Sequence, residues 1–392
     1  MMSKLVPELR FKEFSGEWEE KRLGDIGEFK GGGTPSKKVK EYWEGNIPWI
    51  SSSDIDKNNI HNINISRYIT EIALKKSATK LIPKNSILFI SRVGVGKLAI
   101  NKEELCTSQD FLNFISKKIN NYYLAYFFQV KKNLLKSFNQ GTSIKGFTKN
   151  DLSNLKILIP STPQEQQKIA DTLSSLDNLI EAQTKKVELL KSHKKGLMQK
   201  LFPRDGAKVP EVRFKEFSGE WEEKKLGDCL DYIQPTKYLV SSTDYNHNYN
   251  IPVLTAGKTF ILGYTNETEG IFSEKLPVII FDDFTTASKF VQFPFKAKSS
   301  AMKILIAKNN INIKFMYEAI QLIKYEVGNH GRHWISIFSK IKILIPPTPQ
   351  EQQKIADTFS SLDNLIEAQN KKIELLKEHK KGLMQKMFVN KD

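Results

Sequence analysis

Two long stretches of the chain carry apolar residues at alternating spacings of three and four, and each stretch predicts an amphipathic helix. In the first stretch these residues are Ile169, Leu173, Leu176, Ile180, Val187, Leu190, Leu197 and Leu201. In the second they are Ile355, Phe359, Leu362, Ile366, Ile373, Leu376, Leu383 and Met387. The spacing is that of a coiled-coil seam, so each helix needs a partner for its apolar stripe.

A start signal precedes each stripe. Thr162 and Thr348 are suited to cap a helix, and the proline after each threonine fits the first helical position. Glu165 and Glu351 are expected to complete a capping box. Each predicted helix then runs for nearly forty residues, which is roughly 55 Å at 1.5 Å per residue.

Polar residues interrupt both seams, and such residues can fix the register of a coiled coil. They are Gln183 and Lys194 in the first helix and Gln369 and Lys380 in the second. The nearest partner for either helix is the other one. We therefore expect the two helices to pair antiparallel within one chain, related by a pseudo-twofold axis.

The helices belong to an internal repeat. Residues 160–202 match residues 346–388 with six differences in 43 positions. A second repeated segment, VPELRFKEFSGEWEEKRLGD, spans residues 6–25 and returns at 209–228 with two differences in 20 positions. The regions between these segments, about 26–155 and 229–341, barely resemble each other. The chain is thus one scaffold that occurs twice and presents two different regions.

The two variable regions predict mixed structure. Apolar strands are expected at Ser86–Ser91, Val278–Phe281 and Lys303–Ala307, and helices at Tyr122–Phe138 and Ile313–Tyr325. We predict the α+β fold class, with two recognition domains separated by two long antiparallel helices. The expected segments are a first domain at 1–155, a first helix at 156–203, a second domain at 204–345 and a second helix at 346–392.

Charge favours a polyanionic partner. The chain has 60 Lys and Arg against 44 Asp and Glu, a net charge of +16, and such an excess suits phosphate contact. Solvated surfaces of a lysine-rich protein are the alternative explanation. Cys106 and Cys229 have no neighbouring ligand residues and predict neither a metal site nor a disulfide. No signal peptide and no apolar run of membrane-spanning length is evident, so we expect a cytoplasmic protein.

These patterns together resemble a known family. PELRFKEFSGEWEEKRLGD, a variable region and ILIPSTPQEQQKIADTLSSLDNLIEAQ resemble the specificity subunits of type I restriction-modification systems, and the likeness covers nearly the whole chain twice. Within the first variable region, Gly31–Ser36, Tyr42-Trp43, Ile47–Ile50, Ser53-Asp54 and Ile87–Lys97 also resemble the family's target-recognition domain.

The resemblance implies a function and partners. Each variable region would read one half of a split, asymmetric site in double-stranded DNA. The helices would set the spacing and dock two methyltransferase subunits, and motor-nuclease (restriction) subunits would complete the enzyme. The chain itself would hold no catalytic residues and no cofactor, since S-adenosylmethionine would bind to the methyltransferase subunits.

Three short motifs resemble motifs of two enzyme classes, adenine methyltransferases and P-loop nucleotide-binding proteins, and in both cases the sequence departs from the full pattern. Phe29–Gly33 and Asn46–Trp49 resemble two loops of adenine methyltransferases, but only a dozen residues separate them, whereas those loops belong to distant strands of one sheet. Gly94–Lys97 resembles a P-loop, but Ser91 and Leu98 replace required residues. A free-standing architectural DNA-binding or coiled-coil protein remains an alternative.

The candidate DNA contacts are polar, basic and glycine residues in loops, because these supply donors to bases and phosphates. In the first domain they are Ser91, Arg92, Gly94, Gly96, Lys97, Gln140, Gly141, Thr142, Ser143 and Lys145. In the second they are Thr285, Thr286, Lys289, Asn329, His330, Gly331, Arg332 and His333. Gln140 suits adenine and Arg332 suits guanine. The strand VIIFDDF is predicted to be the counterpart of ILFISRV.

Overall fold

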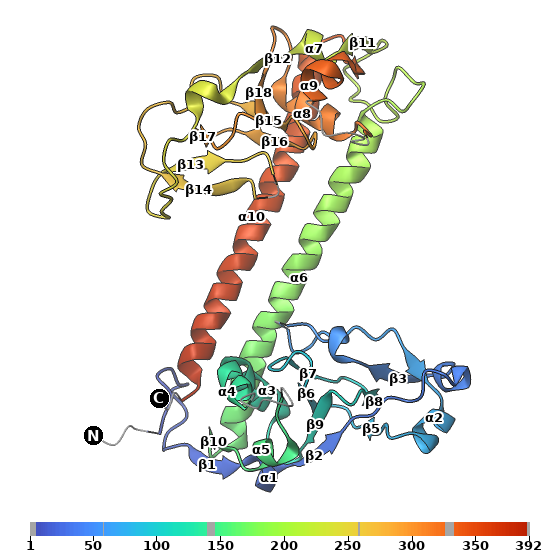
Figure 1. The fold of residues 1–392 in the computed structure, drawn as a ribbon, viewed down its shortest axis with the longest axis vertical. Coiled ribbons are helices and arrows are strands. Elements are labelled where there is room, and N and C mark those ends of the chain that lie inside the picture. Colours follow the sequence, from blue (N-terminus) through green and yellow to red (C-terminus); the bar gives the residue numbers. More distant parts are fainter. Residues whose placement is uncertain (1–4, 58, 139–145, 258, 326–332, 390–392) are drawn as a thin grey trace. The chain divides into compact units, whose positions relative to one another are not determined.

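A computed structural model of the chain describes residues 5–57, 59–138, 146–257, 259–325 and 333–389. The chain divides into two compact units. Unit 1 comprises Met1–Thr184 and Lys371–Asp392, and unit 2 comprises Lys185–Asn370. The predicted long helices are confirmed as α6 (Pro163–Leu201) and α10 (Pro349–Met387), of 39 residues each (Figure 1). Each unit contains one end of α6 and the opposite end of α10.

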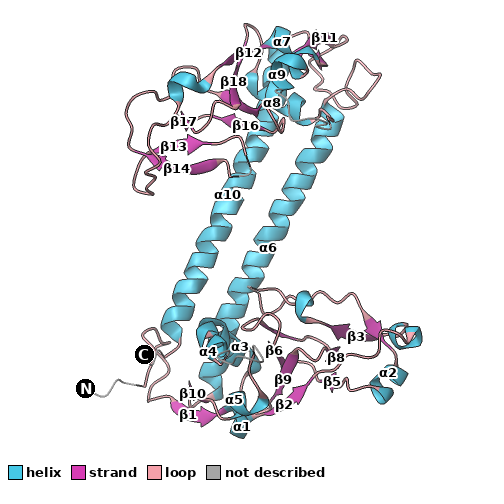
Figure 2. Ribbon diagram, viewed as in Figure 1, coloured by secondary structure: helices cyan, strands magenta, loops and turns pink. Residues whose placement is uncertain are grey.

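Unit 1 is built mainly from short strands, which Figure 2 distinguishes from the helices. Its strands are β1 (Glu19–Arg22), β2 (Glu28–Gly31), β3 (Ile47–Ile50), β4 (Tyr68–Ile69), β5 (Leu81–Ile82), β6 (Ile87–Ile90), β7 (Leu98–Ile100), β8 (Leu105–Thr107), β9 (Phe111–Ile115) and β10 (Lys156–Ile159). Its shorter helices are α1 (Leu23–Ile26), η1 (Lys40–Trp43), η2 (Ser52–Asp54), α2 (Glu71–Lys76), α3 (Asn121–Val130), α4 (Lys132–Ser137) and α5 (Lys149–Ser153).

Unit 2 follows the same order with fewer elements. Its strands are β11 (Glu222–Lys225), β12 (Leu230–Ile233), β13 (Ile251–Leu254), β14 (Ile261–Thr265), β15 (Val278–Asp282), β16 (Ser288–Val291), β17 (Lys296–Ala297), β18 (Met302–Ala307) and β19 (Lys342–Ile345). Its shorter helices are α7 (Leu226–Cys229), η3 (Pro235–Tyr238), α8 (Ile313–Gln321), α9 (His333–Ser336) and η4 (Phe338–Lys340).

The two units share one sheet of equivalent strand order, and their second sheets differ by one strand, β5, although the sequences of the units differ. The four-stranded sheet runs β2-β9-β6-β7 in unit 1 and β12-β18-β15-β16 in unit 2. A second sheet contains a parallel pair in each unit, β3 with β8 and β13 with β17. A two-stranded antiparallel ladder, β1 with β10 or β11 with β19, leads into each long helix. The prediction of a mixed helix and sheet fold, present twice, is confirmed.

The predicted strands are confirmed, but two predicted helices are shorter than expected. Residues Tyr122–Phe138 form two helices, because the chain leaves helical geometry at Lys131 (φ −88°, ψ 35°). Residues Ile313–Tyr325 form a helix only as far as Gln321, with Leu322 at its end. In both cases apolar residues continue at helical spacing beyond the end of the helix, so the pattern alone does not locate that end.

One buried ion pair in each unit joins the two repeated segments. Arg10 donates from Nε and Nη2 to the two carboxylate oxygens of Glu165, at 2.8 and 2.7 Å, and Trp18 Nε1 donates to the same group at 3.3 Å. Arg213, Glu351 and Trp221 repeat this arrangement at 2.8, 2.8 and 3.3 Å. Glu165 and Glu351 are each only 1% exposed. Fork-to-fork pairing of this kind combines charge with fixed geometry.

The predicted capping boxes are therefore only half correct. Glu165 and Glu351 do donate their backbone N–H groups to the hydroxyl oxygens of Thr162 and Thr348, at 3.4 Å in each unit. Their carboxylates, however, bind Arg10 and Arg213 rather than completing the reciprocal bond. The arginine competes successfully because it offers two charge-assisted bonds in place of one neutral N–H donor.

The two glutamines after each glutamate hold the variable region. Gln166 accepts from the backbone N–H of Asn120 at 3.1 Å, and Gln167 accepts from its side chain at 2.6 Å. Asn120 caps α3 by accepting from Tyr123 N. In unit 2, Gln352 and Gln353 hold Asn312, the cap of α8, at 3.0 and 2.7 Å. The same start of the long helix thus holds the equivalent helices α3 and α8 of two dissimilar domains.

Within each unit the ends of α6 and α10 pack antiparallel. In unit 1, Ile169 and Leu173 of α6 share a core with Met387 of α10 and with Phe388. In unit 2, Leu201 of α6 and Phe202 share a core with Ile355 and Phe359 of α10. Every residue of the predicted seam is buried or half-buried, which confirms the apolar stripe.

A polar contact crosses the two helices in each unit. Lys380 donates to Asp177 at 2.5 Å in unit 1, and Lys194 donates to Asp363 at 2.7 Å in unit 2. Lys194 and Lys380 are two of the predicted polar seam residues, and these pairs agree with their expected role in register. The other two, Gln183 and Gln369, each keep a buried side-chain oxygen without a hydrogen bond in the described structure.

The two helix contacts bind different side chains of the variable regions. In unit 1, Tyr126 donates to Asp177 at 2.7 Å, and His61 Nε2 lies 2.9 Å from the Tyr126 hydroxyl. Burial lowers the pKa of His61, although the nearby Asp177 carboxylate acts in the opposite direction. In unit 2, Lys314 and Glu318 occupy the corresponding place.

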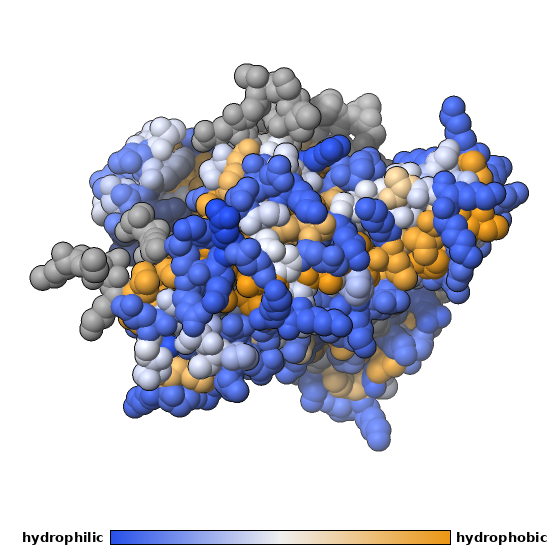
Figure 3. All heavy atoms as spheres, turned by 90° about the horizontal axis from the view of Figure 1, so that it is seen from below, coloured by the Kyte–Doolittle hydropathy of each residue, from blue (hydrophilic) through white to orange (hydrophobic). Residues whose placement is uncertain are grey.

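The surface agrees with the charged composition. In the face drawn in Figure 3, hydrophilic residues predominate and hydrophobic ones are interspersed among them. Among the described helices, none has both the length and the hydropathy of a membrane span.

Replacing Glu165 by Gln should destabilise unit 1. The substitution leaves the buried Arg10 charge without its counter-ion, and breaking a buried pair in this way costs about 3–5 kcal/mol. Glu13→Gln is the matched control, because Glu13 pairs with Lys168 at the surface, where solvent screens the pair and its loss should shift the midpoint far less. Urea unfolding followed by tryptophan fluorescence measures both; equal shifts for the two variants would contradict the assigned role of the buried pair.

Acid should weaken unit 1 through His61. Because the pKa of folded His61 is depressed, the unfolded chain takes up the proton first. Stability is therefore complete above about pH 6.5 and is lost as the pH falls towards the folded value, by at most about 1.4 kcal/mol per pH unit. The urea midpoint should fall less steeply between pH 7.5 and 5.5 in His61→Gln than in the unsubstituted chain. His247→Gln, at an exposed position, should leave the slope unchanged.

Candidate nucleic-acid interface

The hairpin between β6 and β7 carries five of the predicted contact residues. Strand β6 is fully buried, so the exposed turn that follows rests on a rigid base. Gly94 and Gly96 adopt φ values of +96° and +94°, which favour glycine. Lys97 closes the turn by donating its backbone N–H to Gly94 O at 3.2 Å. Arg92 is exposed at the tip.

Ser91 supports the hairpin instead of facing solvent. Its side chain and its backbone N–H both donate to Asp110 O, at 3.0 and 2.8 Å, and the residue is buried. Its carbonyl accepts from Phe147 N at 3.1 Å. A Cβ atom on Gly146 would lie 2.0 Å from that carbonyl, so only glycine allows this approach. Gly146 and Phe147, the first described residues after position 145, are thus held against the hairpin.

Unit 2 repeats this attachment with other residues. Asp283 follows β15 as Ser91 follows β6, and its backbone N–H donates to Ala301 O at 3.2 Å. Its carbonyl accepts from His333 N at 2.9 Å, and its side chain accepts from Trp334 N at 2.8 Å. Strands β6 and β15 also hold equivalent positions in their sheets. The prediction that VIIFDDF is the counterpart of ILFISRV is confirmed.

The predicted residues of the second hairpin have different environments. Thr285 is exposed, and its hydroxyl donates to Asp282 Oδ2 at 2.7 Å. Thr286 has a φ of +61°, an unusual value for a β-branched residue. Lys289 is exposed on the edge strand β16. His333 is buried, and its Nδ1 lies 3.3 Å from the Tyr325 hydroxyl.

Several predicted contacts lie outside the described residues. These are Gln140, Gly141, Thr142, Ser143 and Lys145 in the first half and Asn329, His330, Gly331 and Arg332 in the second. The described residues that follow these positions lie at the hairpins: Gly146 lies against Ser91, and His333 is bonded to Asp283.

The motifs that resembled enzymes have structural roles. A Cβ on Gly32 would lie 2.1 Å from Ser108 O, and Trp49 Nε1 donates to Gly33 O at 3.0 Å. The two motifs therefore pack against each other. Gly94–Lys97 lies in a strand-to-strand hairpin, not between a strand and a helix as in a P-loop. Among the described residues, no group of three or more His, Cys, Asp or Glu side chains could hold a metal ion.

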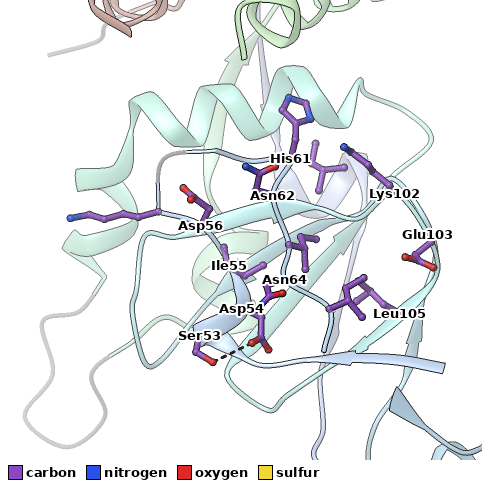
Figure 4. Close-up of a pocket in the computed structure, with 14 residues that line it drawn as sticks. Ser53, Asp54, Ile55, Asp56, His61, Asn62, Asn64, Lys102, Glu103 and Leu105 are labelled. Carbon is purple, nitrogen blue, oxygen red and sulfur yellow. Dashed lines mark hydrogen bonds between the residues drawn. The ribbon is translucent and has the colours of Figure 1, made fainter. Parts of the chain in front are cut away.

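Unit 1 also contains an open pocket of about 800 Å³. His61, Asn62 and Lys102 line it, together with Asp56 and Glu103 (Figure 4). The lining mixes acidic, basic and amide side chains, so the pocket has no single charge that would select a ligand.

Sequence reasoning missed the lysines of α4 beside the first hairpin. Lys132 and Lys136 are four residues apart on this helix, and a Cβ on Gly96 would meet the Lys136 side chain at 3.6 Å. The spacing was a usable signal, since residues four apart share a helix face. It went unused because the sequence analysis sought DNA contacts in loops, and these lysines lie in a segment that was expected to be helical.

Comparison with known proteins agrees with the repeated architecture. The family model described as "Type I restriction modification DNA specificity domain" matches residues 15–191 and 218–378. The MjaIX type I restriction enzyme specificity subunit of Methanocaldococcus jannaschii is 32% identical over 425 aligned residues, covering 98% of this chain and 97% of that protein. A type I restriction enzyme specificity subunit of Escherichia coli is 53% identical over 142 residues, 35% of each chain.

A solved structure shares the fold. The S subunit of a type I restriction-modification system from M. genitalium matches with a TM-score of 0.71 at 18% identity, covering 99% of this chain and all of that one. The family model matches both halves and the M. jannaschii relative matches almost end to end, so this chain belongs to the type I restriction-modification DNA specificity family.

Proposed function

We propose that the chain is the non-catalytic subunit that directs a type I methyltransferase and endonuclease complex to a split DNA site. One observation carries the proposal. Two units that share one sheet of equivalent strand order and the same helix attachments present unlike residues at equivalent hairpins, Ser91–Lys97 and Asp283–Lys289. Different side chains on equivalent supports are what two different half-sites require.

The polar and basic hairpin residues that are exposed or half-buried are the proposed DNA contacts. Arg92 and Lys97 in unit 1, and Thr285 and Lys289 in unit 2, offer donors to phosphates and base edges. Gln140 and Arg332 remain proposed readers of adenine and guanine. Ser91 and His333 are buried and hydrogen-bonded, so we assign them to positioning of the loops.

The long helices are proposed to form one intramolecular antiparallel coiled coil with pseudo-twofold symmetry. Antiparallel packing inside each unit, with Asp177–Lys380 and Asp363–Lys194 at the same repeat positions, supports this. The domain limits are proposed at 1–155 and 204–345, with the helical segments 156–203 and 346–392 between and after them. A rod of this kind would leave a fixed number of bases unread between the half-sites.

The proposed partners are double-stranded DNA, two methyltransferase subunits and the restriction subunits, in the cytoplasm. Two near-identical helical segments in one chain would supply two like docking sites. S-adenosylmethionine would bind to the methyltransferase subunits. A free-standing architectural DNA-binding protein is the alternative, and the family match does not favour it.

The purified chain should not methylate DNA alone. Mixed with cognate methyltransferase subunits and S-adenosylmethionine, it should give N6-adenine methylation at one bipartite motif, because the reading and the chemistry reside in different subunits. Sequencing of the methylated DNA measures this. Methylation by the chain alone would contradict the proposal, and tight specific binding that needs no partner would favour the architectural alternative.

Inserting seven residues into both long helices should change only the gap in the motif. Seven residues keep the seam in phase and lengthen the rod by roughly 10 Å, about three base pairs at 3.4 Å each. Methylome sequencing of a host that expresses the variant should show both half-sites unchanged. An unaltered gap would remove the spacer role, while an altered half-site would show that the helices affect base reading.

A further inference from the structure

Helix α4 has no counterpart among the described residues of unit 2. From the helix cap Asn120 to Phe147 the chain advances 27 positions, whereas from Asn312 to His333 it advances 21. Both intervals join structurally equivalent points, because each begins at a cap held by the long helix and ends at a bond to the hairpin. The six extra residues correspond in number to α4, Lys132–Ser137.

Helix α4 places the side chain of Lys136 beside Gly96 of the β6–β7 hairpin. Lys136 covers Gly96, since a Cβ on that glycine would lie 3.6 Å from Lys136 Cε and 3.7 Å from its Cγ. Lys132 Nζ donates to Lys57 O at 3.4 Å, which joins α4 to the loop after η2. Lys57 and Lys136 are exposed, and Lys132 is half-buried.

We define the lysine cluster as Lys57, Lys132 and Lys136; its three positive charges exceed the one negative charge, that of Asp56, which acts on Lys132. Among the described residues, none of the three forms an ion pair with a carboxylate. Burial lowers the pKa of Lys132, and the charges of Lys57, Lys136 and Lys380 lower it further, against a smaller opposite effect of Asp56.

Like charges held together cost free energy unless an anion binds among them. Arg92 at the hairpin tip and Lys97 at its base are also absent from the ion pairs of the described residues. The cations therefore come from three directions: the hairpin, α4 and the Lys57 loop.

We propose that the lysine cluster binds a phosphate of the DNA backbone beside the β6–β7 hairpin, and thereby fixes how unit 1 sits on its half-site. This rests on the proposed function. Phosphate contacts orient a protein on the duplex without reading bases. Because the described residues of unit 2 include no counterpart of α4, we expect unit 1 to bind its half-site with the larger sequence-independent share of the affinity.

The test uses the chain assembled with its methyltransferase subunits and duplex DNA that carries its methylation motif. Lys132→Ala combined with Lys136→Ala should weaken binding and reduce the slope of log K against log salt by about 0.9 for each phosphate that is no longer neutralised. Lys75→Ala combined with Lys76→Ala is the matched control, because it removes the same charge from α2, another short helix of unit 1. The control should keep the original slope to within measurement error.

Two further variants separate charge from folding. Lys132→Arg with Lys136→Arg keeps both cations and should restore most of the slope. Lys57→Ala alters a different element and should reduce the slope on its own. The methylated motif should stay the same in every variant, because a phosphate contact carries no base information.

The outcomes distinguish the inference from the proposed function. If the unsubstituted complex shows no sequence-specific binding, the proposed function fails. If that complex binds specifically but the α4 double variant keeps its affinity and slope, the inference alone is overturned. A relaxed base in the motif would overturn it by showing base reading. Loss of assembly with the methyltransferase would overturn it in favour of an acidic protein partner.

Discussion

The buried pairing of Arg10 with Glu165, repeated by Arg213 with Glu351, is the constraint on which the architecture depends. Each glutamate is removed from water and receives two arginine bonds and one tryptophan bond. A buried carboxylate is unfavourable without such partners. The pair can form only when the first repeated segment lies against the start of the long helix. This explains why both segments recur almost unchanged around dissimilar regions.

A self-contained scaffold leaves the inserted region free to vary. The scaffold asks little of the variable domain: an asparagine cap that Gln166 and Gln167 can hold, and an aromatic ring against the buried tryptophan. Tyr123 meets Trp18 in unit 1, and Phe315 meets Trp221 in unit 2. Where α6 and α10 contact each other, the variable region is less restricted. Asp177 accepts from Tyr126 in unit 1, and Asp363 accepts from Lys314 in unit 2. The same position tolerates a neutral or a charged partner because its own lysine already balances the aspartate.

The sequence predicted what periodicity and repetition encode. Both long helices, their seam and the equivalence of the strands before the two hairpins were predictable, because each leaves a regular pattern. Glu165 was assigned to a capping box because its true partner, Arg10, is 155 residues away, and local signals cannot report such a contact. The break at Lys131 and the burial of Ser91 and His333 were missed for the same reason. A shared Asn-Ile-Pro at 46–48 and 250–252, which precedes or opens β3 and β13, was an available signal that these two strands are equivalent.

The proposed reading of DNA by the hairpins would require each hairpin to be held firmly relative to the long helices. In unit 1 the connection is short and buried: β6 supports the turn, β9 joins β6 to α3, and α3 is fixed at its cap by Gln166 and Gln167 and at Tyr126 by Asp177. Each step is a strand pairing or a hydrogen bond to a carboxylate or an amide side chain. A hairpin held in this way has little freedom relative to the end of its helix. Side chains at the exposed end of the hairpin can then differ without moving the strands that support them, which is what the proposed DNA contacts require.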